Sequence, residues 1–555
     1  MGLLKVDVLA LGMLSALRRC LQLRAVLRGE PWGLADIPRE DAATYDMICA
    51  ADTVGVFQIE SRAQMSMLPR LQPRVFYDLV VQVAIVRPGP IQGGMVHPYL
   101  QARERRRHGQ PLELEKPELE AALARTLGVP IFQEQVMQIA MIAAGFGPGM
   151  ADDLRRSMAA WKRKGGVHRF ERPLIGGMEA RGYRTEFAQA IFQQMLGFGE
   201  YGFPESHAHS FALLSYASSW LKCHEPACFL AALLNSLPMG FYSASQLVQD
   251  ARRHGVRVLP IDVLASHWDC TLEGPLAAVP GVALPQPAVR LGLRLVSGLA
   301  TAAGQRLVQI RQALHDAAVA GKPGAAPAPA LAPEFVPATC FTSTEDLALR
   351  AQLSQQDLQA LAAADALASL SGHRRQQMWD AAAQHTAPAL WRDVPVHEVP
   401  LALPAAHEGE EIVFDYAATG LTLRRHPLAL LRPRLARWRL QTALQLHSAP
   451  NGRKVRACGI VTMRQRPGTA KGTMFVTLED ETGPVNVIVW PALVEHWRQP
   501  LLGARLLAVE GVWQCSPHGP DGQAVVRHLV AQRFKDLTPL LGRMAQALQG
   551  SRDFH

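Results

Sequence analysis

Apolar residues recur with a helical period over most of the first half of the chain. Segments such as EQVMQIAMIAAGF and FALLSYASSWLKCHEPACFLAALLNSL repeat them every three to four positions, which predicts helices within residues 13–265. The Gly- and Pro-rich stretches RPGPIQGGM, GFGPGM and GFGEYGFPESH interrupt this pattern and predict loops. The pattern therefore predicts a large helical domain punctuated by glycine-rich loops.

From about residue 453 the period of the apolar residues changes to two. Five segments follow this alternation: KVRACGIVTMRQR, TMFVTLED, GPVNVIVW, ARLLAVEGVWQ and AVVRHLVAQRF. Turn residues separate most of them, as expected for consecutive strands. Five short strands with this spacing predict a Greek-key barrel of the OB type over residues 453–535, followed by a tail over residues 536–555.

The N-terminal residues 1–12 alternate apolar side chains around Lys5 and Asp7. This pattern predicts a buried strand that leads into a helix. Because side chains two apart on a strand share a face, Lys5 and Asp7 are expected to point the same way.

The middle of the chain predicts three further regions. Residues 266–319 begin with turns, and VRLGLRLVSGLATAAGQRLVQIR then predicts a helix, a tight turn and a second helix. The segment AGKPGAAPAPALAPEFVPA predicts a semi-rigid Ala/Pro linker within residues 320–340. Helices return within residues 341–452. Together these patterns predict a multidomain α+β protein.

Composition adds three constraints. The 555 residues are 48% hydrophobic and 19% charged, which excludes wholesale disorder, and the net charge of +9 suits a polyanionic partner. No uncharged run reaches the roughly 18 residues of a membrane span, and the N-terminus has no basic leader, so we expect a cytoplasmic protein without a membrane partner. Of the eight cysteines only Cys223 and Cys228 are close, which favours buried free thiols over a zinc site.

The string GLLKVDVLALGML resembles a palm strand of bacterial DNA polymerase III alpha subunits, the C-family DNA polymerases. It is followed, in the family's order, by strings similar to its finger motifs: TVGVFQIESR, VAIVRPGP, PIFQEQVMQIA, DDLRRSMAAWKRK and EYGFPESHAHSFALLSYASSWLKCHEP. Residues 290–316 resemble its helix-hairpin-helix element. DYAATGLTLRRHPLALLR and FVTLEDETGPVNVIVWP resemble the error-prone branch in particular.

The resemblance implies a domain order along the chain. It is the end of a palm (1–12), fingers (13–265), a helix-hairpin-helix region (266–319), the linker (320–340), a duplex-binding region with a connector (341–452) and an OB barrel (453–535). The implied activity is error-prone DNA synthesis during repair and translesion synthesis. The implied substrates are primer–template DNA and deoxynucleoside triphosphates, and the implied protein partners are a sliding clamp and an inactive Y-family-like protein.

The resemblance implies that Asp7 is a catalytic carboxylate that binds metal, in a complete enzyme that uses two Mg²⁺ ions. The family's other two acids form an Asp-x-Asp pair upstream of this strand, and the present sequence contains no Asp-x-Asp. We therefore expect the isolated chain to be inactive, with the N-terminal part truncated, excluded by a wrongly assigned start, or supplied by another chain. The alternatives are a non-catalytic DNA-binding scaffold of a mutagenic repair complex and a degenerating fragment.

Nucleotide-binding residues are implied mainly by the finger motifs. On a helix Arg155 lies over Lys162, and the family places such a basic helix against the triphosphate. A solvated basic face is the alternative. The implied set is Lys5, Arg87, Arg155, Arg156, Lys162, Lys164, Tyr201 and His207. His207 as a general acid competes with a simpler reading in which Ser206 caps a helix. Gln133 and Gln135 are ambiguous, and the run Arg103, Arg105, Arg106 and Arg107 is expected to be a solvated face.

DNA-binding residues are expected in the hairpin and the barrel. Ser297 and Gly298 lie at the tip of the hairpin, where backbone N–H groups meet a phosphate in such motifs, although an ordinary helix connection is possible. The barrel is expected to bind single strands through Arg464, Arg466, Lys471 and Phe475, unless it binds protein instead. The segment 388–391 is similar to clamp-binding peptides, with a packed loop as the alternative.

Overall fold

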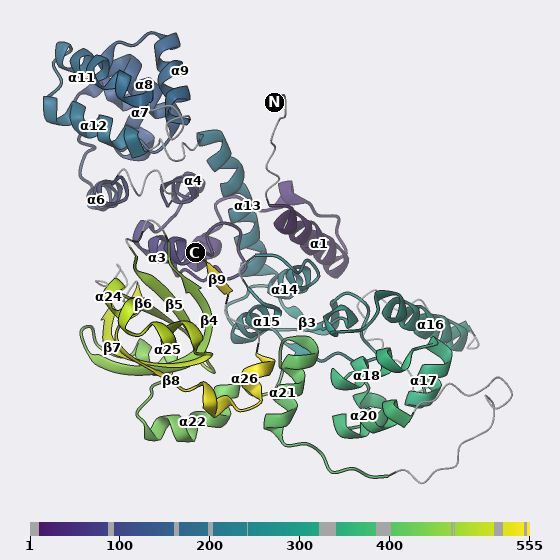
Figure 1. Ribbon diagram of the computed structural model, residues 1–555. Coiled ribbons are helices and arrows are strands. Elements are labelled where there is room, and N and C mark those ends of the chain that lie inside the picture. Colours follow the sequence, from purple (N-terminus) through teal and green to yellow (C-terminus); the bar gives the residue numbers. More distant parts are fainter. Residues whose placement is uncertain are drawn as a thin grey trace.

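The fold joins a long helical part to a C-terminal barrel (Figure 1). The computed structural model describes residues 10–86, 94–159, 166–197, 204–240, 242–320, 340–383, 401–467, 470, 472–515, 526–548 and 552–554. The predicted multidomain α+β class is confirmed. The predicted palm strand and the Ala/Pro linker lie outside the described residues.

The predicted helical domain is present. Its helices are α1 (Leu11–Arg28), α2 (Ala42–Cys49), α3 (Arg62–Leu71), α4 (Phe76–Ile85), α6 (Val96–Arg107), α7 (Glu120–Leu123), α8 (Gln133–Ala144), α9 (Pro148–Ala159), α11 (Glu171–Ala180), α12 (Thr185–Gly197), α13 (Glu205–His224), α14 (Pro226–Leu234) and α15 (Ala244–Arg253). Local sequence starts several of them: Asp41, Ser61 and Ser243 accept backbone N–H groups at the N-termini of α2, α3 and α15. None of the described helices has the uninterrupted apolar length needed to cross a bilayer.

Helices α7, α8, α9, α11 and α12 form a lobe of their own, from which α13 runs toward α1 and α14 (Figure 1). Within this lobe α11 approaches α8 closely at Gly177. A Cβ on Gly177 would collide with the carbonyl oxygen of Ala144 and lie 3.1 Å from its Cα. The neighbouring Gly176 has open space around it.

A buried ion pair holds α1 against the start of α14. Arg28 donates from Nε and Nη2 to the two carboxylate oxygens of Glu225, at 3.0 and 2.9 Å, and Glu225 is fully buried. Arg28 also donates to the carbonyl of Pro285 at 3.2 Å. Two parallel bonds from one guanidinium fix the relative orientation of the two helices.

The structure of residues 258–320 differs from one prediction. The first of the two helices expected there is instead strand β3 (Gln286–Arg290) followed by one 3-10 turn (Leu293–Leu295). Strand β3 lies between β1 (Val258–Leu259) and β2 (Thr271–Ala277) in a three-stranded sheet. Short apolar runs suit either period, and burial of four of the five β3 residues selects the strand. The second helix is α16 (Thr301–Ala320).

Helices return after the linker, as predicted. They are α17 (Thr344–Ala351), α18 (Gln355–Ala363), α19 (Ala368–Ser371), α20 (Arg374–Ala383), α21 (Glu408–Thr419), α22 (Pro427–Arg437) and α23 (Ala443–His447). Arg374, 2% exposed, joins α20 to α21: it pairs with Glu411 at 2.8 Å, with Asp415, and with Asp365 at 3.8 Å. Arg424 also pairs with these three acids.

All five predicted barrel strands are confirmed. They are β4 (Lys454–Gln465), β5 (Met474–Asp480), β6 (Gly483–Val489), β7 (Leu506–Cys515) and β8 (Arg527–Asp536), with β9 (Arg552–Phe554) added beside β4. The order β5-β6-β8-β7-β4 closes through the β4–β5 pairing. Met474, Val476 and Leu478 point into the barrel core, as the period-two pattern predicts. The short helices α24 (Pro491–His496), α25 (Arg498–Gly503) and α26 (Met544–Ala547) complete this part.

Candidate functional site

Two adjacent arginines on α9 share one carboxylate. Asp152 accepts hydrogen bonds from Arg155 Nε at 3.0 Å and Nη2 at 2.8 Å, and it pairs with Arg156 at 2.6 Å. The spacings of three and four residues place all three side chains on one helix face. The hydrogen bonds from Arg155, followed by the charge of Arg156, lower the pKa of Asp152. Asp152 thus orients both guanidinium groups.

These two guanidinium groups remain accessible. The Arg155 side chain is 40% exposed and that of Arg156 is 70% exposed. Each guanidinium has five N–H donors, so Asp152 leaves donors on both for an anionic ligand. The arrangement is therefore compatible with the predicted triphosphate contact and equally with a solvated basic face. Lys162 and Lys164, predicted to extend this surface, lie outside the described residues.

Four other predicted site residues lie outside the described residues: Lys5, Asp7, Arg87 and Tyr201. The clamp-like segment 388–391 does too. Their assignments rest on sequence and remain predictions.

His207 lies in the first turn of α13, partly buried, with its ring centroid 4.2 Å from that of Phe211. The prediction that Ser206 caps a helix is wrong. Helix α13 begins at Glu205 after Pro204, so Ser206 lies inside the first turn. Glu205 anchors this turn by accepting a hydrogen bond from Tyr77 at 2.8 Å.

The run of arginines on α6 is only partly solvated, which corrects another prediction. Arg103 donates to both oxygens of Asp78 at 2.6 Å and to the carbonyl of Leu71 at 2.6 Å. Its side chain is 16% exposed, whereas Arg105 and Arg106 are exposed. Arg103 therefore ties α6 to the start of α4 and the end of α3.

The ambiguous Gln135 also has a structural role. Its side-chain oxygen accepts the backbone N–H groups of Ile131 and Phe132 at 2.8 and 3.1 Å, and its amide donates to Thr126 at 2.7 Å. Buried amides satisfied on both sides fix local structure. Gln133 is 8% exposed in the same turn.

The tip of the hairpin before α16 is exposed and supported from two sides. The backbone N–H of Ser297 donates to the carbonyl of Ala418 at 2.8 Å, and that of Ala300 donates to Asp357 at 3.2 Å. Gly298 has a φ of +84°, a conformation that other residues rarely adopt. The Ser297 amide is therefore not available to a phosphate. Within the described residues, the amides of Gly298 and Thr301 have no protein acceptor.

The barrel residues separate into two groups. Arg464 is 5% exposed and donates to the carbonyls of Leu501 at 2.8 Å and Ala504 at 2.5 Å, so it holds α25 to β4 and does not offer its guanidinium to DNA. The prediction that Arg464 contacts DNA is therefore wrong. Arg466 is exposed and Phe475 partly exposed at the same end of β4 and β5. Lys471 lies outside the described residues.

The outward face of β5 meets helices α3 and α15. Arg62 on α3 donates to Thr477, and Arg253 on α15 lies 3.8 Å from Glu479. Burial raises the pKa of Glu479 and lowers the pKa of Arg62 to about 9. Part of the face expected to bind single strands is thus covered, and Phe475 lies at its uncovered end.

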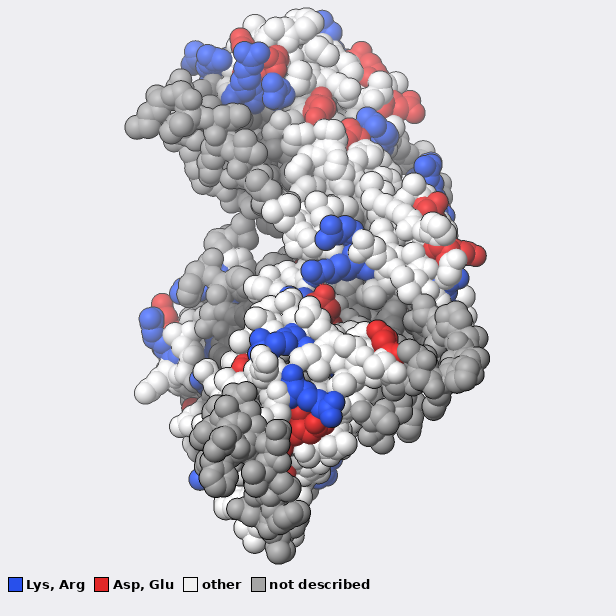
Figure 2. Space-filling view, turned by 90° about the vertical axis from the view of Figure 1, so that its right-hand side faces the viewer, with Lys and Arg blue, Asp and Glu red and all other residues white. Residues whose placement is uncertain are grey.

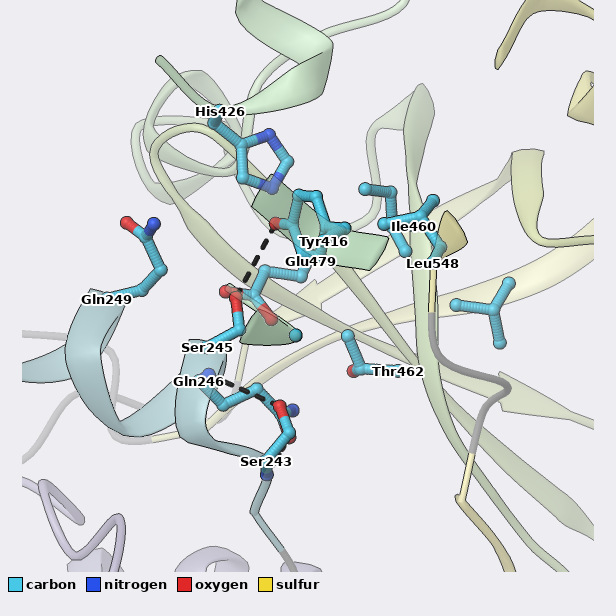
Figure 3. Close-up of a pocket in the computed structure, with 12 residues that line it drawn as sticks. Ser243, Ser245, Gln246, Gln249, Tyr416, His426, Ile460, Thr462, Glu479 and Leu548 are labelled. Atoms are coloured by element: carbon cyan, nitrogen blue, oxygen red, sulfur yellow. Dashed lines mark hydrogen bonds between the residues drawn. The ribbon is translucent and has the colours of Figure 1, made fainter. Parts of the chain in front are cut away.

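A small cavity lies beside this contact (Figure 3). It has a volume of about 70 Å³ between the start of α15, the end of α21 and strands β4 and β5. Ser245 and Tyr416 face each other across it, 3.5 Å apart, with Glu479 beside them (Figure 3). Its lining mixes polar with apolar side chains such as Ile460 and Leu548, and its small volume suits a few waters rather than a nucleotide.

Sequence reasoning missed a cluster of ionisable residues at the α13–α15 junction. Lys222, 7% exposed, donates to Asp52 at 2.9 Å and to Asp250 at 3.0 Å, and His254 lies 2.5 Å from Asp52. Burial opposes ionisation of Asp52, but the charge of Lys222 lowers its pKa. The hydrogen bond with Asp52 raises the pKa of His254. No local motif marks residues so far apart in the sequence.

Asp52, Asp250 and His254 are close enough to hold a cation, since their ligand atoms lie within 4.8 Å of one another. The ammonium of Lys222 already bridges the two carboxylates, so this cluster does not fit a pair of Mg²⁺ ions, which need several free carboxylate oxygens. On α9, Asp152 is likewise engaged by two arginines. The described residues therefore do not provide the two-ion site that the family resemblance implies.

On one face of the molecule, the described charges are spread out rather than concentrated (Figure 2). The face shown in Figure 2 carries Lys and Arg side chains in separate groups, several with Asp or Glu beside them. The net charge of +9 is therefore not displayed there as one continuous basic surface.

Comparisons with known proteins agree along the chain. Residues 13–182 match the bacterial DNA polymerase III alpha subunit finger domain, residues 255–318 a helix-hairpin-helix motif, and residues 455–537 an OB-fold nucleic acid binding domain. A crystal structure of asparaginyl-tRNA synthetase from Pyrococcus horikoshii aligns over 17% of this chain and 22% of its own, at 22% identity. Its TM-score of 0.14 supports no argument.

Relatives named error-prone DNA polymerase match over the whole chain. Those of Bordetella bronchiseptica and Ralstonia nicotianae are 60% and 57% identical over 100% of this chain and 49% of their own length. That of Azoarcus sp. is 56% identical with the same coverage. The chain thus spans about half the length of the curated relatives it matches. With a DNA polymerase III alpha subunit finger domain, a helix-hairpin-helix motif and an OB-fold domain, the chain is similar over its whole length to about half the length of relatives named error-prone DNA polymerase.

Proposed function

We propose that this chain is the finger, helix-hairpin-helix and barrel portion of an error-prone DNA polymerase that copies damaged templates during DNA repair. The observation that carries the proposal is the 60% identity, over the whole chain, to a relative named error-prone DNA polymerase. The substrates are primer–template DNA and deoxynucleoside triphosphates. A sliding clamp and an inactive Y-family-like protein are the proposed protein partners.

In this proposal the incoming triphosphate is bound by the fingers. Arg155 and Arg156 are the best-supported contacts to the triphosphate, because Asp152 orients both guanidinium groups and leaves N–H donors exposed on each. Fixed cations there offset the charge that develops on the leaving pyrophosphate. The other proposed contacts, from sequence, are Lys5, Arg87, Lys162, Lys164, Tyr201 and His207.

Template and primer are bound by the hairpin and the barrel. Gly298 and the first turn of α16 offer free N–H groups, a sequence-independent way to hold a phosphate. Ser297 contributes through its exposed side chain, since its amide is engaged. On the barrel, Arg466, Lys471 and Phe475 are the proposed single-strand contacts.

The catalytic carboxylates are proposed to be shared between Asp7 and acids that this sequence lacks. Asp7 would help hold Mg²⁺ in the complete enzyme, and no Asp-x-Asp accompanies it here. The purified 555-residue chain is therefore expected not to extend primers.

Primer extension by the purified chain with Mg²⁺ and deoxynucleotides tests this directly. It is run beside Asp7→Ala and beside a mixture with the N-terminal half of the Bordetella bronchiseptica relative. We expect no extension by the chain alone and Asp7-dependent extension in the mixture. Extension by the chain alone that Asp7→Ala abolishes would refute the proposed lack of acids.

A DNA-binding scaffold is the second candidate. It is favoured by the two matched nucleic-acid modules in a chain without an Asp-x-Asp. Primer extension combined with a DNA-binding measurement separates the polymerase from the scaffold. Salt-sensitive primer–template binding without extension in the mixture supports the scaffold. An unstable chain that binds no DNA would support the third reading, a degenerating fragment.

A further inference from the structure

The end of α22 and the neighbouring barrel strands form a surface rich in cations around one exposed tryptophan. We call it the Trp438 surface; it comprises Trp438, Arg434, Arg437, Arg439, Arg456, Arg533 and Lys535. All seven residues are exposed. Helix α22 lies beside β8 at the base of the barrel (Figure 1).

Trp438 stands between two cations without being covered by them. Its ring centroid lies 5.4 Å from the Arg434 guanidinium and 5.5 Å from the Lys535 ammonium, and the residue is 39% exposed. At Trp32, by contrast, Arg24 is already stacked at 3.6 Å. The indole of Trp438 thus keeps surface on which another flat group can stack.

The adjoining strands continue the positive charge. Arg456, Glu510 and Arg533 are cross-strand neighbours on β4, β7 and β8. Arg456 pairs with Glu510 at 2.7 Å and keeps 52% of its side chain exposed. Within the described residues, the other five cations of the Trp438 surface have no carboxylate partner. In the part of the chain that the structure describes, the six cations of the Trp438 surface therefore have one acidic partner among them, Glu510.

The backbone holds this surface in one geometry. The N–H of Gln441 donates to the carbonyl of Arg456 at 2.8 Å, which joins the segment after α22 to β4. Arg439 adopts a φ of +57°, and its N–H donates to the carbonyl of Ala436 at 2.8 Å. A non-glycine residue in this conformation needs such local support. Trp438 and its cations are thus presented on a fixed frame.

We propose that the Trp438 surface binds single-stranded nucleic acid, with an unpaired base stacked on Trp438 and the flanking phosphates held by the arginines. Stacking on an aromatic ring between cations is the usual way to hold a strand without reading its sequence. A duplex offers no free base face, and an acidic peptide would not need the exposed indole.

This site is separate from the proposed single-strand contacts at Arg466 and Phe475. Arg456 and Arg466 are ten residues apart along β4, roughly 30 Å of extended chain. The proposal thus adds a second strand contact to the barrel and does not depend on polymerase activity.

The test is fluorescence anisotropy of fluorescein-labelled oligo-dT with the full 555-residue chain at several salt concentrations. Trp438→Ala should weaken binding about tenfold, within the range for loss of one base stack. Trp379→Ala is the matched control, because Trp379 is 52% exposed on α20, outside the Trp438 surface. It should leave affinity unchanged. Thermal unfolding of both variants checks that the barrel remains folded.

Charge variants sharpen the test. Arg434→Ala should lower the salt dependence, log affinity against log salt, by about 0.7, the value for one phosphate contact to a single strand. Glu510→Gln should raise affinity at low salt, because it removes the carboxylate that pairs with Arg456. Poly-glutamate is the competing probe and should displace oligo-dT poorly. The proposal is overturned if Trp438→Ala leaves affinity unchanged, or if poly-glutamate competes as well as unlabelled oligo-dT.

Discussion

Arginines of this chain have three different surroundings that their sequence context does not distinguish. Arg155 is half exposed on a helix, Arg103 is tied to Asp78, and Arg464 lies inside the barrel on two carbonyls. All three occur in basic or strand-like segments that predicted accessible cations. Side-chain burial depends on contacts between segments far apart in sequence, which a local pattern cannot contain.

The buried Arg374 gives the largest stability prediction. Its guanidinium compensates Glu411 and Asp415, so Arg374→Met would leave buried carboxylates without their main partner. We expect the free energy of unfolding to fall by about 3–5 kcal/mol, measured by urea denaturation. Arg375→Ala is the control: Arg375 is 42% exposed in a surface pair with Glu410, and its loss should cost at most about 1 kcal/mol. Equal effects of the two substitutions would contradict this assignment.

His254 predicts a pH-dependent contribution to stability. Its pKa is raised above 6.5 by Asp52, with Asp250 and Lys222 also facing it, so its stabilisation is complete below about pH 6.5 and declines as pH rises through the folded-state pKa. The difference in Tm between wild type and His254→Gln should therefore be largest near pH 6 and narrow toward pH 9. His108→Gln, at an exposed pair with Glu104, is the control and should give a small, nearly constant difference. A difference in Tm that grows with pH would contradict this prediction.

At the scale of elements, two neighbouring glycines of α11 predict opposite outcomes. Gly177→Ala places a methyl group against the backbone of Ala144 and should destabilise the fold by roughly 1–3 kcal/mol or more, since backbone cannot yield as a side chain can. Gly176→Ala meets open space and should be neutral or stabilise by up to about 1 kcal/mol through helix propensity. Both values come from urea denaturation. Similar effects of the two changes would mean that α8 and α11 do not approach as described.

Elements with a strong period were predicted correctly, and elements without one were not. The barrel strands follow from alternation because one face of each is buried in a single core, as at Met474, Val476 and Leu478. Strand β3 is short and buried at four of its five residues, so its sequence lacks a period, and this region was predicted to be a helix. For the site, motifs marked Arg155 and Arg156, whereas the Lys222 cluster required the fold itself.

At the scale of the molecule, the finger, hairpin and barrel parts should act together on DNA. If several cations contact phosphates, the affinity for primer–template should fall steeply with salt, by about 0.9 in log affinity per log salt for each duplex phosphate contact. Anisotropy titrations with a labelled primer–template between low and physiological salt measure this slope. Poly-glutamate as competitor controls for unspecific anion binding. Salt-independent binding, or none at low salt, would remove the case for DNA contact.

The pairing of Arg28 with Glu225 has a consequence for folding during synthesis. These residues are 197 positions apart, so α1 leaves the ribosome long before α14 exists to cover it. At about 5–20 residues per second the delay is roughly 10–40 s. During that interval the inner face of α1, with Met13, Leu17 and Cys20, has no native partner on α14. The pace of synthesis between these two helices therefore sets how long the apolar face of α1 stays uncovered on the nascent chain.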